Sequence, residues 1–172
     1  MKNVILLIAT LFSVVYYSYS QELVENKIDD FTNKAIKRTS WERLFYTNKG
    51  NVYFRISNID NSYYFDFKYM DGSVFSVEKG AKLMFKLEND SIYTLENLEY
   101  GITGYGEGAI GFSGSLGMGI KLTYVSLDDT KFEILGNKKA KRLRFYTSKG
   151  YIEEDLKPQR AELIPNAIKL VR

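Results

Sequence analysis

The chain of 172 residues contains no histidine and no cysteine. Histidine is the side chain most often used as an acid or base near neutral pH, and it is the commonest metal ligand. Cysteine supplies thiol nucleophiles, the usual zinc sites and disulfides, so these are excluded as well. We therefore expect no cofactor and no metal site, and the composition favours a protein that is not an enzyme. Because no disulfide can form, the packing of the core must hold the fold together.

Proline and excess charge are also scarce. The two prolines, Pro158 and Pro165, both lie near the end of the chain. The net charge is only +3, whereas binding of nucleic acid calls for a clustered basic face. We expect no nucleic acid among the partners and no strong attraction to a membrane surface.

The first twenty residues have the order of parts that is typical of a secretory signal peptide. Lys2 gives positive charge, residues 4–15 form an uncharged apolar run, and Ser18 and Ser20 stand at the −3 and −1 positions of a cut after Ser20. The run is shorter than the about 20 residues of a membrane-spanning helix. We predict that residues 1–20 are removed, that no membrane span remains, and that the mature chain is exported to the periplasm or secreted. An uncleaved anchor is the alternative.

After the signal peptide we expect a polar lead-in over residues 21–34 and a single β-rich domain over residues 35–172. Within this domain apolar and polar residues alternate, as at Val52, Phe54 and Ile56. A period of two is typical of half-buried strands, and the turn residues between these segments favour antiparallel connections. One such turn, Asp71-Gly72, predicts a tight hairpin.

Two segments favour helices. Residues 161–171 place Leu163, Ile164, Ala167, Ile168 and Val171 on one helical face. A shorter helix is predicted to end at Gly136, with Phe132, Ile134 and Leu135 on its buried side. The predicted fold class is therefore α+β, mainly antiparallel β-sheet with a C-terminal helix. The alternative is an all-β sandwich or barrel with an appended helix.

Residues 101–119 interrupt the alternation and contain eight of the 13 glycines. Residues 106–111 formally match the pattern G-x-G-x-x-G, but the dinucleotide-binding motif needs a helix after it, and more glycines follow instead. We interpret the segment as a flexible or bulged connection. A ligand-binding loop is the alternative, because long loops in compact domains often carry function.

Residues 45–50 and 145–150 resemble each other, reading Phe-Tyr-Thr-Asn-Lys-Gly and Phe-Tyr-Thr-Ser-Lys-Gly. An ancient duplication of a strand–turn unit would explain the likeness. So would the independent use of the same turn residues at two strand ends, which is the interpretation that the differing flanks favour.

Carboxylates and aromatic side chains are the remaining candidates for function. Asp66 and Asp71 are the pair that a carboxylate-based hydrolase could use, if a cleft brought them together. Aromatic residues are more often core residues than ligand contacts. A surface platform for sugars, if there is one, is predicted to use these four side chains: Trp41, Tyr53, Tyr64 and Tyr105.

The chain as a whole resembles exported, uncharacterised proteins of Bacteroidetes-type bacteria. The resemblance is carried by Asp30-Phe31-Thr32, by Thr39-Ser40-Trp41-Glu42, by the glycine-rich middle, and by residues 142–147 with Gly150-Tyr151-Ile152. It implies a small periplasmic or secreted domain, and it implies no catalytic residue.

The sequence thus predicts an exported domain of the cell envelope that acts as a non-enzymatic binding or structural module. Its partner would be an envelope protein or a glycan. A carbohydrate-binding module and a carboxylate-based hydrolase are the alternatives.

Overall fold

A computed structural model of the chain describes residues 21–47, 50–108, 117–126 and 129–172. The predicted signal peptide lies outside the described residues, as does the stretch 109–116 of the glycine-rich segment.

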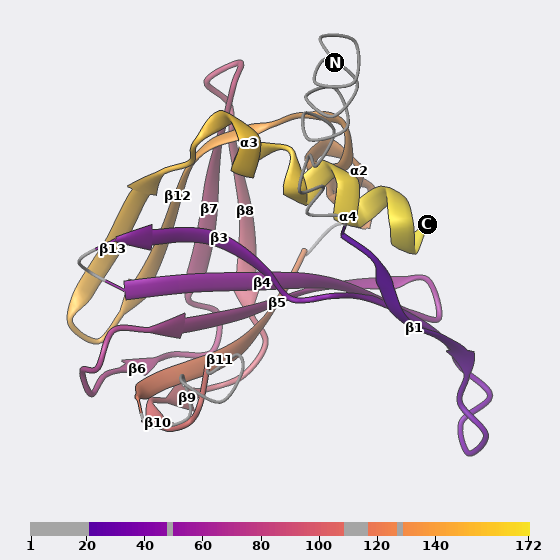
Figure 1. Cartoon of the computed structure of the whole chain (residues 1–172), viewed down its shortest axis with the longest axis horizontal. Helices are drawn as coiled ribbons and strands as arrows, with labels where there is room; N and C mark the ends of the chain where they lie inside the picture. The colour runs from indigo at the N-terminus through magenta and orange to yellow at the C-terminus, as the bar shows by residue number, and fades with distance from the viewer. Residues whose placement is uncertain (1–20, 48–49, 109–116, 127–128) are drawn as a thin grey trace, which may run out of the picture.

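The structure is dominated by one curled antiparallel sheet of eleven strands (Figure 1). Nine strands follow one another across it in the order β1 (Leu23–Ile28), β2 (Ala35–Thr39), β4 (Gly50–Ile59), β5 (Ser62–Met70), β11 (Met118–Val125), β8 (Ile92–Asn97), β7 (Lys82–Leu87), β12 (Ala140–Thr147) and β13 (Gly150–Asp155).

The remaining strands lie at the margins. Strand β3 (Glu42–Thr47) pairs with β4, and β10 (Gly104–Tyr105) pairs with β11, while β6 (Ser76–Val77) and β9 (Gly101–Ile102) form a separate two-stranded ribbon. The three described helices are α2 (Asp129–Asn137), α3 (Pro158–Ala161) and α4 (Leu163–Val171). This architecture confirms the predicted α+β class with a mainly antiparallel sheet and a C-terminal helix.

The sheet bends sharply between β11 and β8, which are paired at only two positions, Tyr124 with Asn97 and Val125 with Glu96. As a result β7 and β8 run almost at right angles to β4 and β5 in Figure 1. The two halves enclose an aromatic core: the ring centroids of Phe65 and Phe85 are 5.4 Å apart, and those of Phe67 and Phe145 are 4.9 Å apart. Burial of each such side chain stabilises the fold by roughly 1.5–3 kcal/mol.

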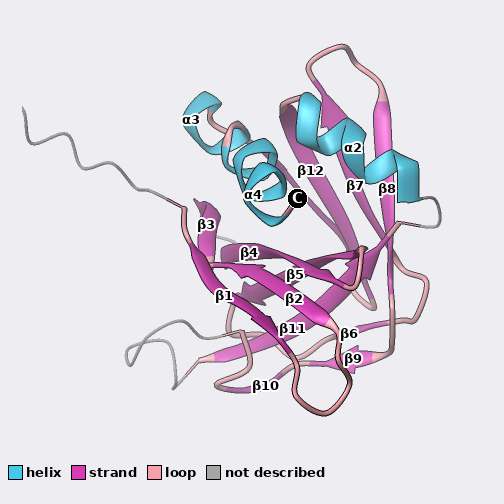
Figure 2. Ribbon diagram, turned by 90° about the vertical axis from the view of Figure 1, so that its right-hand side faces the viewer, coloured by secondary structure: helices cyan, strands magenta, loops and turns pink. Residues whose placement is uncertain are grey.

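Helix α4 covers the end of the curled sheet between its two halves (Figure 2). The face predicted from the sequence is the buried one, since Ile164, Ala167 and Val171 are completely inaccessible. The amide of Asn58 in β4 donates to the carbonyl oxygen of Val171 at 2.8 Å, which fixes the helix end on the sheet.

Three local expectations differ from the structure. Part of the predicted lead-in forms strand β1, which pairs with β2, so the sheet begins before residue 35. Ile134 of α2 is 37% exposed, because only Phe132 and Leu135 of the predicted trio fall on the side of the helix that meets the core.

The prediction of a hairpin at Asp71-Gly72 is wrong, because β5 pairs with β4 and β11 and not with the strand that follows it. Asp71 instead accepts hydrogen bonds from the backbone N–H and the hydroxyl of Ser73, at 2.8 and 2.9 Å. The local side-chain bonds of an Asx turn thus take the place of strand pairing here.

Candidate functional site

The outer face of β4 and β5 holds three of the four aromatic residues predicted to bind sugars. Trp41 lies in the bend between β2 and β3, and its ring has two cations over it: the Arg55 guanidinium at 4.6 Å and the Lys68 ammonium at 4.5 Å. Burial, followed by the nearby charges of Lys121 and Arg55, lowers the pKa of Lys68. Because cations lie against the indole, stacking a sugar there would require displacing them.

The two tyrosines of this face do not form a continuous platform with each other. Tyr53 lies opposite Lys68 in the sheet, and Tyr64 lies opposite Ser57. Tyr53 and Ser57 are four positions apart on β4, which is about 13 Å along a strand. Tyr105, which is 80% exposed, lies in β10 beside Met118, apart from the other three.

Between the two tyrosines lies Asp66, whose carboxylate is bound on several sides. Arg55 Nε donates to its Oδ2 at 2.8 Å, the Ser57 hydroxyl to the same oxygen at 2.9 Å, and the Thr123 hydroxyl to Oδ1 at 3.0 Å. The side chain of Asp66 is only 9% exposed. A carboxylate held in this way ties three strands together and has few free lone pairs for acid–base chemistry.

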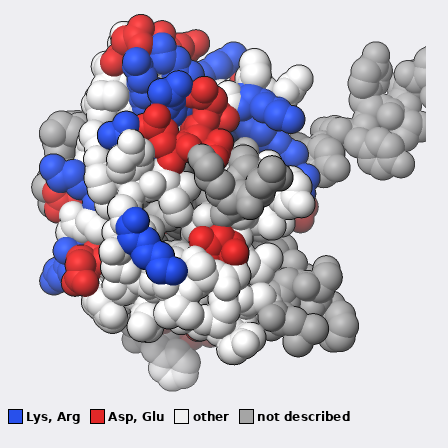
Figure 3. Space-filling view, turned by 90° about the vertical axis from the view of Figure 1, so that its left-hand side faces the viewer, with Lys and Arg blue, Asp and Glu red and all other residues white. Residues whose placement is uncertain are grey.

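A more suitable site lies where two hairpins end, on the side of the molecule drawn in Figure 3. There a pocket of about 370 Å³ opens between the end of β5 and the hairpin β12–β13, and its size falls within the range typical of small-molecule sites. We call it the hairpin-end pocket. Charged groups gather in the upper part of the face in Figure 3, and the lower part is mostly uncharged. The lining of the hairpin-end pocket consists of Tyr69, Asp71, Ser73, Phe75, Thr147, Lys149, Tyr151 and Ile152.

The two similar sequence segments form the two hairpins at this end of the sheet. In β3–β4, Thr47 pairs with Gly50 and Phe45 with Val52; in β12–β13, Thr147 pairs with Gly150 and Phe145 with Ile152. Both phenylalanines are buried. The likeness therefore extends to the register of the hairpins, although residues 48–49 at the first turn lie outside the described residues.

Hydrogen bonds fix the walls of the hairpin-end pocket. The backbone N–H of Ser76 donates to the Ser148 hydroxyl at 3.0 Å, and the backbone N–H of Ser148 donates to the Ser76 carbonyl at 2.8 Å. On the other side of the ribbon, the Phe75 N–H donates to the Thr103 hydroxyl at 3.1 Å. The pocket is thus bounded by two segments that are hydrogen-bonded to each other. Because its walls are already ordered, binding of a ligand would cost little conformational entropy.

The floor of the hairpin-end pocket is a short polar chain. The Tyr69 hydroxyl donates to Asp71 Oδ2 at 3.3 Å, and the Ser73 hydroxyl lies 2.9 Å from each oxygen of that carboxylate. Burial raises the pKa of the Tyr69 hydroxyl, and the neighbouring charge of Asp71 raises it further. Tyr69 therefore stays protonated near neutral pH and donates to Asp71.

The lining of the hairpin-end pocket suits a neutral, hydroxyl-rich molecule. Asp71 accepts hydrogen bonds and Lys149 donates them, while the hydroxyls of Ser73 and Thr147, which already donate to Asp71 and to the Gly150 carbonyl oxygen, can accept them. Tyr151, which is 58% exposed, adds an aromatic ring; the Arg144 guanidinium lies over this ring at 4.4 Å from its centroid, so a ligand would stack on the opposite face. Among the described residues, no group of three or more acidic side chains is placed to hold a metal ion.

Sequence reasoning did not find this pocket. Its polar residues come from segments about 75 positions apart, and nothing in the local pattern indicates that they meet. The only available signal was the likeness between residues 45–50 and 145–150, since the second segment carries Thr147 and Lys149 and is followed directly by Tyr151.

Comparisons with known proteins add no identity. The chain matches no family model, no curated protein and no solved structure. Every helix in the part of the chain that the structure describes falls short of the length and hydrophobicity needed to cross a bilayer.

Proposed function

We propose that this chain is an exported, non-enzymatic binding module of a bacterial cell envelope, and that the hairpin-end pocket is its binding site. The observation that carries the proposal is the pocket itself. It is a concave site of about 370 Å³ with clamped walls, and it has an aromatic ring beside a carboxylate, a lysine and two hydroxyls.

A saccharide is the ligand class that this lining favours. Sugars present hydroxyls that pair with both donors and acceptors, and they present C–H faces that pack on aromatic rings. The hairpin-end pocket offers Asp71 and Ser73 on one wall, and Thr147, Lys149 and Tyr151 on the other. The binding surface thus differs from the one predicted from the sequence around Trp41.

A carboxylate-based hydrolase is less well supported. Asp66 and Asp71 are five positions apart along an extended chain, a span of about 16 Å, and Asp66 is held in its ion pair with Arg55 on the outer face. Glycoside hydrolysis needs two carboxylates about 5–9.5 Å apart across the scissile bond. Asp71 is the single carboxylate in the lining of the hairpin-end pocket.

The exported location rests on the sequence of residues 1–20, and the absence of cysteine agrees with it, because the mature chain would carry no thiol into an oxidising compartment. The resemblance to exported bacterial proteins supports the same proposal.

The binding function is tested with the mature chain, residues 21–172, on a glycan array followed by calorimetry with the glycans that bind. We expect at least one saccharide to bind, and we expect the variants Asp71→Ala and Tyr151→Ala each to weaken its affinity about tenfold or more.

The matched control is Tyr105→Ala, which removes an exposed tyrosine outside the hairpin-end pocket and should leave affinity unchanged. An array without a single binder would count against the saccharide. Equal losses in Tyr151→Ala and Tyr105→Ala would exclude the pocket.

A further inference from the structure

A second cavity lies where the curled sheet does not close on itself. In the described part of the chain, β3 pairs only with β4, and β13 pairs only with β12. These two strands border a gap that α3, which packs against β3, partly covers. The gap contains a cavity of about 250 Å³, which we call the seam cavity, lined on one side by Arg43–Tyr46 and on the other by Asp155, Lys157 and Arg160.

The seam cavity differs from the hairpin-end pocket in its charge. Three cationic side chains line it, Arg43, Lys157 and Arg160, against the single carboxylate of Asp155. Positive charge concentrated in a concave site raises the local concentration of anions and speeds their association.

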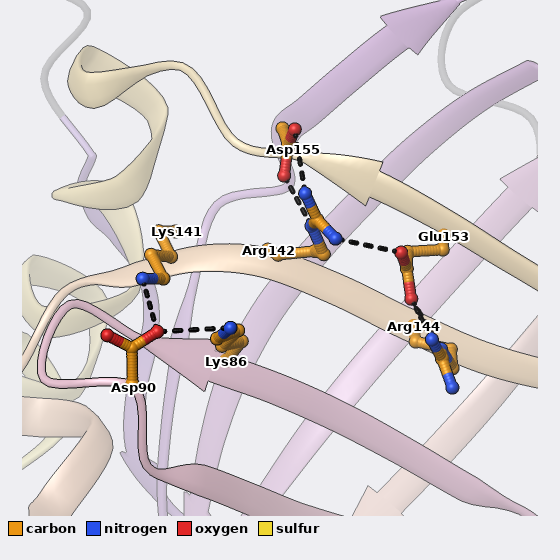
Figure 4. A network of polar contacts seen from close by, with 7 residues as sticks. All are labelled: Lys86, Asp90, Lys141, Arg142, Arg144, Glu153 and Asp155. Atoms are coloured by element: carbon orange, nitrogen blue, oxygen red, sulfur yellow. Dashed lines mark hydrogen bonds and ion pairs between the residues drawn. The ribbon is translucent and has the colours of Figure 1, made fainter.

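The one carboxylate is already neutralised from outside the seam cavity. Arg142 donates from Nε to Asp155 Oδ1 at 2.5 Å and from an Nη to Oδ2 at 3.2 Å (Figure 4). This is the two-pronged geometry in which an arginine binds a carboxylate most strongly. Asp155 is therefore not available to balance the cations on the cavity side.

Arg43 and Lys157 are exposed, and no acidic side chain among the described residues pairs with either of them. Together they supply two positive charges, and Arg160 adds a guanidinium that presents several donors. A ligand group with two negative charges and oxygens pointing in several directions would match this set. A phosphate monoester, with a charge of about −1.5 to −2 near neutral pH and three terminal oxygens, has both properties.

We propose that the seam cavity binds a phosphate monoester, with Arg43, Lys157 and Arg160 as its donors. The cavity has room for about eight waters at ~30 Å³ each, so a phosphate alone would leave part of it empty. Tyr46, which is 70% exposed and lines the cavity, offers a surface for the organic part of the ligand. A soluble sugar and a lipid headgroup are the two sources of such a phosphate group, and both present the same chemistry to the three cations.

The test measures binding of the mature chain to four soluble probes by calorimetry: inorganic phosphate, glucose 6-phosphate, glucose and glucuronate. We expect both phosphates to bind, glucose 6-phosphate more tightly because of Tyr46, and we expect neither glucose nor glucuronate to compete with them at this cavity. Sedimentation with phosphatidylcholine vesicles, with and without phosphatidic acid, identifies a lipid source if only the acidic vesicles bring the protein down.

Paired variants make the assignment specific. The double variant Arg43→Gln/Lys157→Gln should weaken binding of glucose 6-phosphate about tenfold or more. Its control, Lys86→Gln/Lys141→Gln, removes two equal charges from the network around Asp90 in Figure 4, outside the cavity. The control should retain wild-type affinity.

Equal losses in the two double variants would show attraction by net charge alone and would overturn the proposal. So would tighter binding of glucuronate than of glucose 6-phosphate, or no binding of any phosphate. Because Arg43 and Lys157 are exposed, both variants should keep the wild-type melting temperature. The outcome is separate from saccharide binding at the hairpin-end pocket, since none of these substitutions touches that pocket.

Discussion

Arg55 and Asp66 form an ion pair across β4 and β5, with Nε 2.8 Å from Oδ2. The pair lies on the outer face of the sheet, yet both side chains are largely covered, at 18% and 9% exposure. Trp41 covers the Arg55 guanidinium, and the hydroxyls of Ser57 and Thr123 complete the shell of Asp66. A charge pair that is this well covered affects stability more than one in open solvent.

Replacing Asp66 by asparagine should therefore destabilise the protein by about 2–3 kcal/mol, because Arg55 would keep its charge without a partner. Chemical denaturation of the mature chain measures the change. The matched control is Asp90→Asn, which loosens an exposed pair with Lys86 and Lys141 and should barely move the midpoint. Equal shifts in the two variants would contradict a structural role for the covered pair.

At Tyr124, by contrast, a substitution should stabilise the protein. Its ring is fully buried, and no described residue forms a hydrogen bond with its hydroxyl. Removing an unsatisfied buried hydroxyl without changing the shape of the ring should help the fold, so Tyr124→Phe should stabilise the protein by about 1 kcal/mol. The control Tyr69→Phe loses the bond to Asp71 and should be neutral or destabilising. A destabilised Tyr124→Phe would mean that its hydroxyl has a partner.

The same tyrosines set the dependence of stability on pH. Burial raises the pKa of Tyr124 and of Tyr69 above the ordinary value of about 10, so the folded state holds these protons where the unfolded state loses them. The contribution of the two tyrosines to the free energy of unfolding is complete below pH 10. It is lost as the pH rises above 10, by up to about 1.4 kcal/mol per pH unit for each group. With no histidine or cysteine in the chain, stability should be nearly flat from pH 6 to 9.

Denaturation midpoints measured from pH 6 to 11.5 test this profile. Tyr124→Phe should lose stability less steeply than the wild type as the pH rises above 10. A transition near pH 6.5 in the wild type would contradict the account, because no side chain in the sequence ordinarily titrates there.

The two similar hairpins give a matched pair of glycines. Both Gly50 and Gly150 have positive φ, at 137° and 110°. A Cβ on Gly50 would lie 2.6 Å from the Met70 carbonyl oxygen, whereas a Cβ on Gly150 would meet nothing within 4 Å. Gly150→Ala should cost about 1–2 kcal/mol for backbone strain alone. Gly50→Ala should cost roughly 3 kcal/mol or more, because overpacking adds to the strain. Equal costs, measured by denaturation, would mean that the close approach at Gly50 is relieved at little cost.

The strands of this fold could be predicted from the sequence because alternation is local. Val52, Phe54 and Ile56 point into the core as their alternation predicts, and the final helix buries the face that its spacing predicts. Sheet order could not be predicted in this way, since β11 reaches its place between β5 and β8 through contacts that are distant in sequence.

The candidate site was missed for the same reason. Ser76 and Ser148, which hold the walls of the hairpin-end pocket together, are 72 positions apart. Trp41 and Tyr53 lie on the outer face of β4 and β5, but no sequence pattern reveals that Arg55 and Lys68 lie against the indole. Asp71-Gly72 predicts a hairpin because Asp-Gly is typical of such turns, whereas in the structure Asp71 binds Ser73 in an Asx turn instead.

Export predicts a defined mature N-terminus. Expressed in a bacterium that exports it, the chain should be recovered outside the cytoplasm and should begin at Gln21, with the mass of residues 21–172. N-terminal sequencing and the intact mass measure this. Replacing Ser18 and Ser20 by bulky residues should block the cut, because small residues are needed at −3 and −1. A soluble cytosolic protein that still carries Met1 would contradict export.

The most direct test of the account as a whole is to map a bound ligand on the mature protein by the backbone amide NMR signals, using a saccharide that binds on the array. We predict that the signals that shift will cluster at residues 69–75 and 147–152, the two walls of the hairpin-end pocket. Shifts confined to Trp41, Tyr53 and Tyr64 on the outer face of β4 and β5, or no saccharide that shifts any signal, would contradict it.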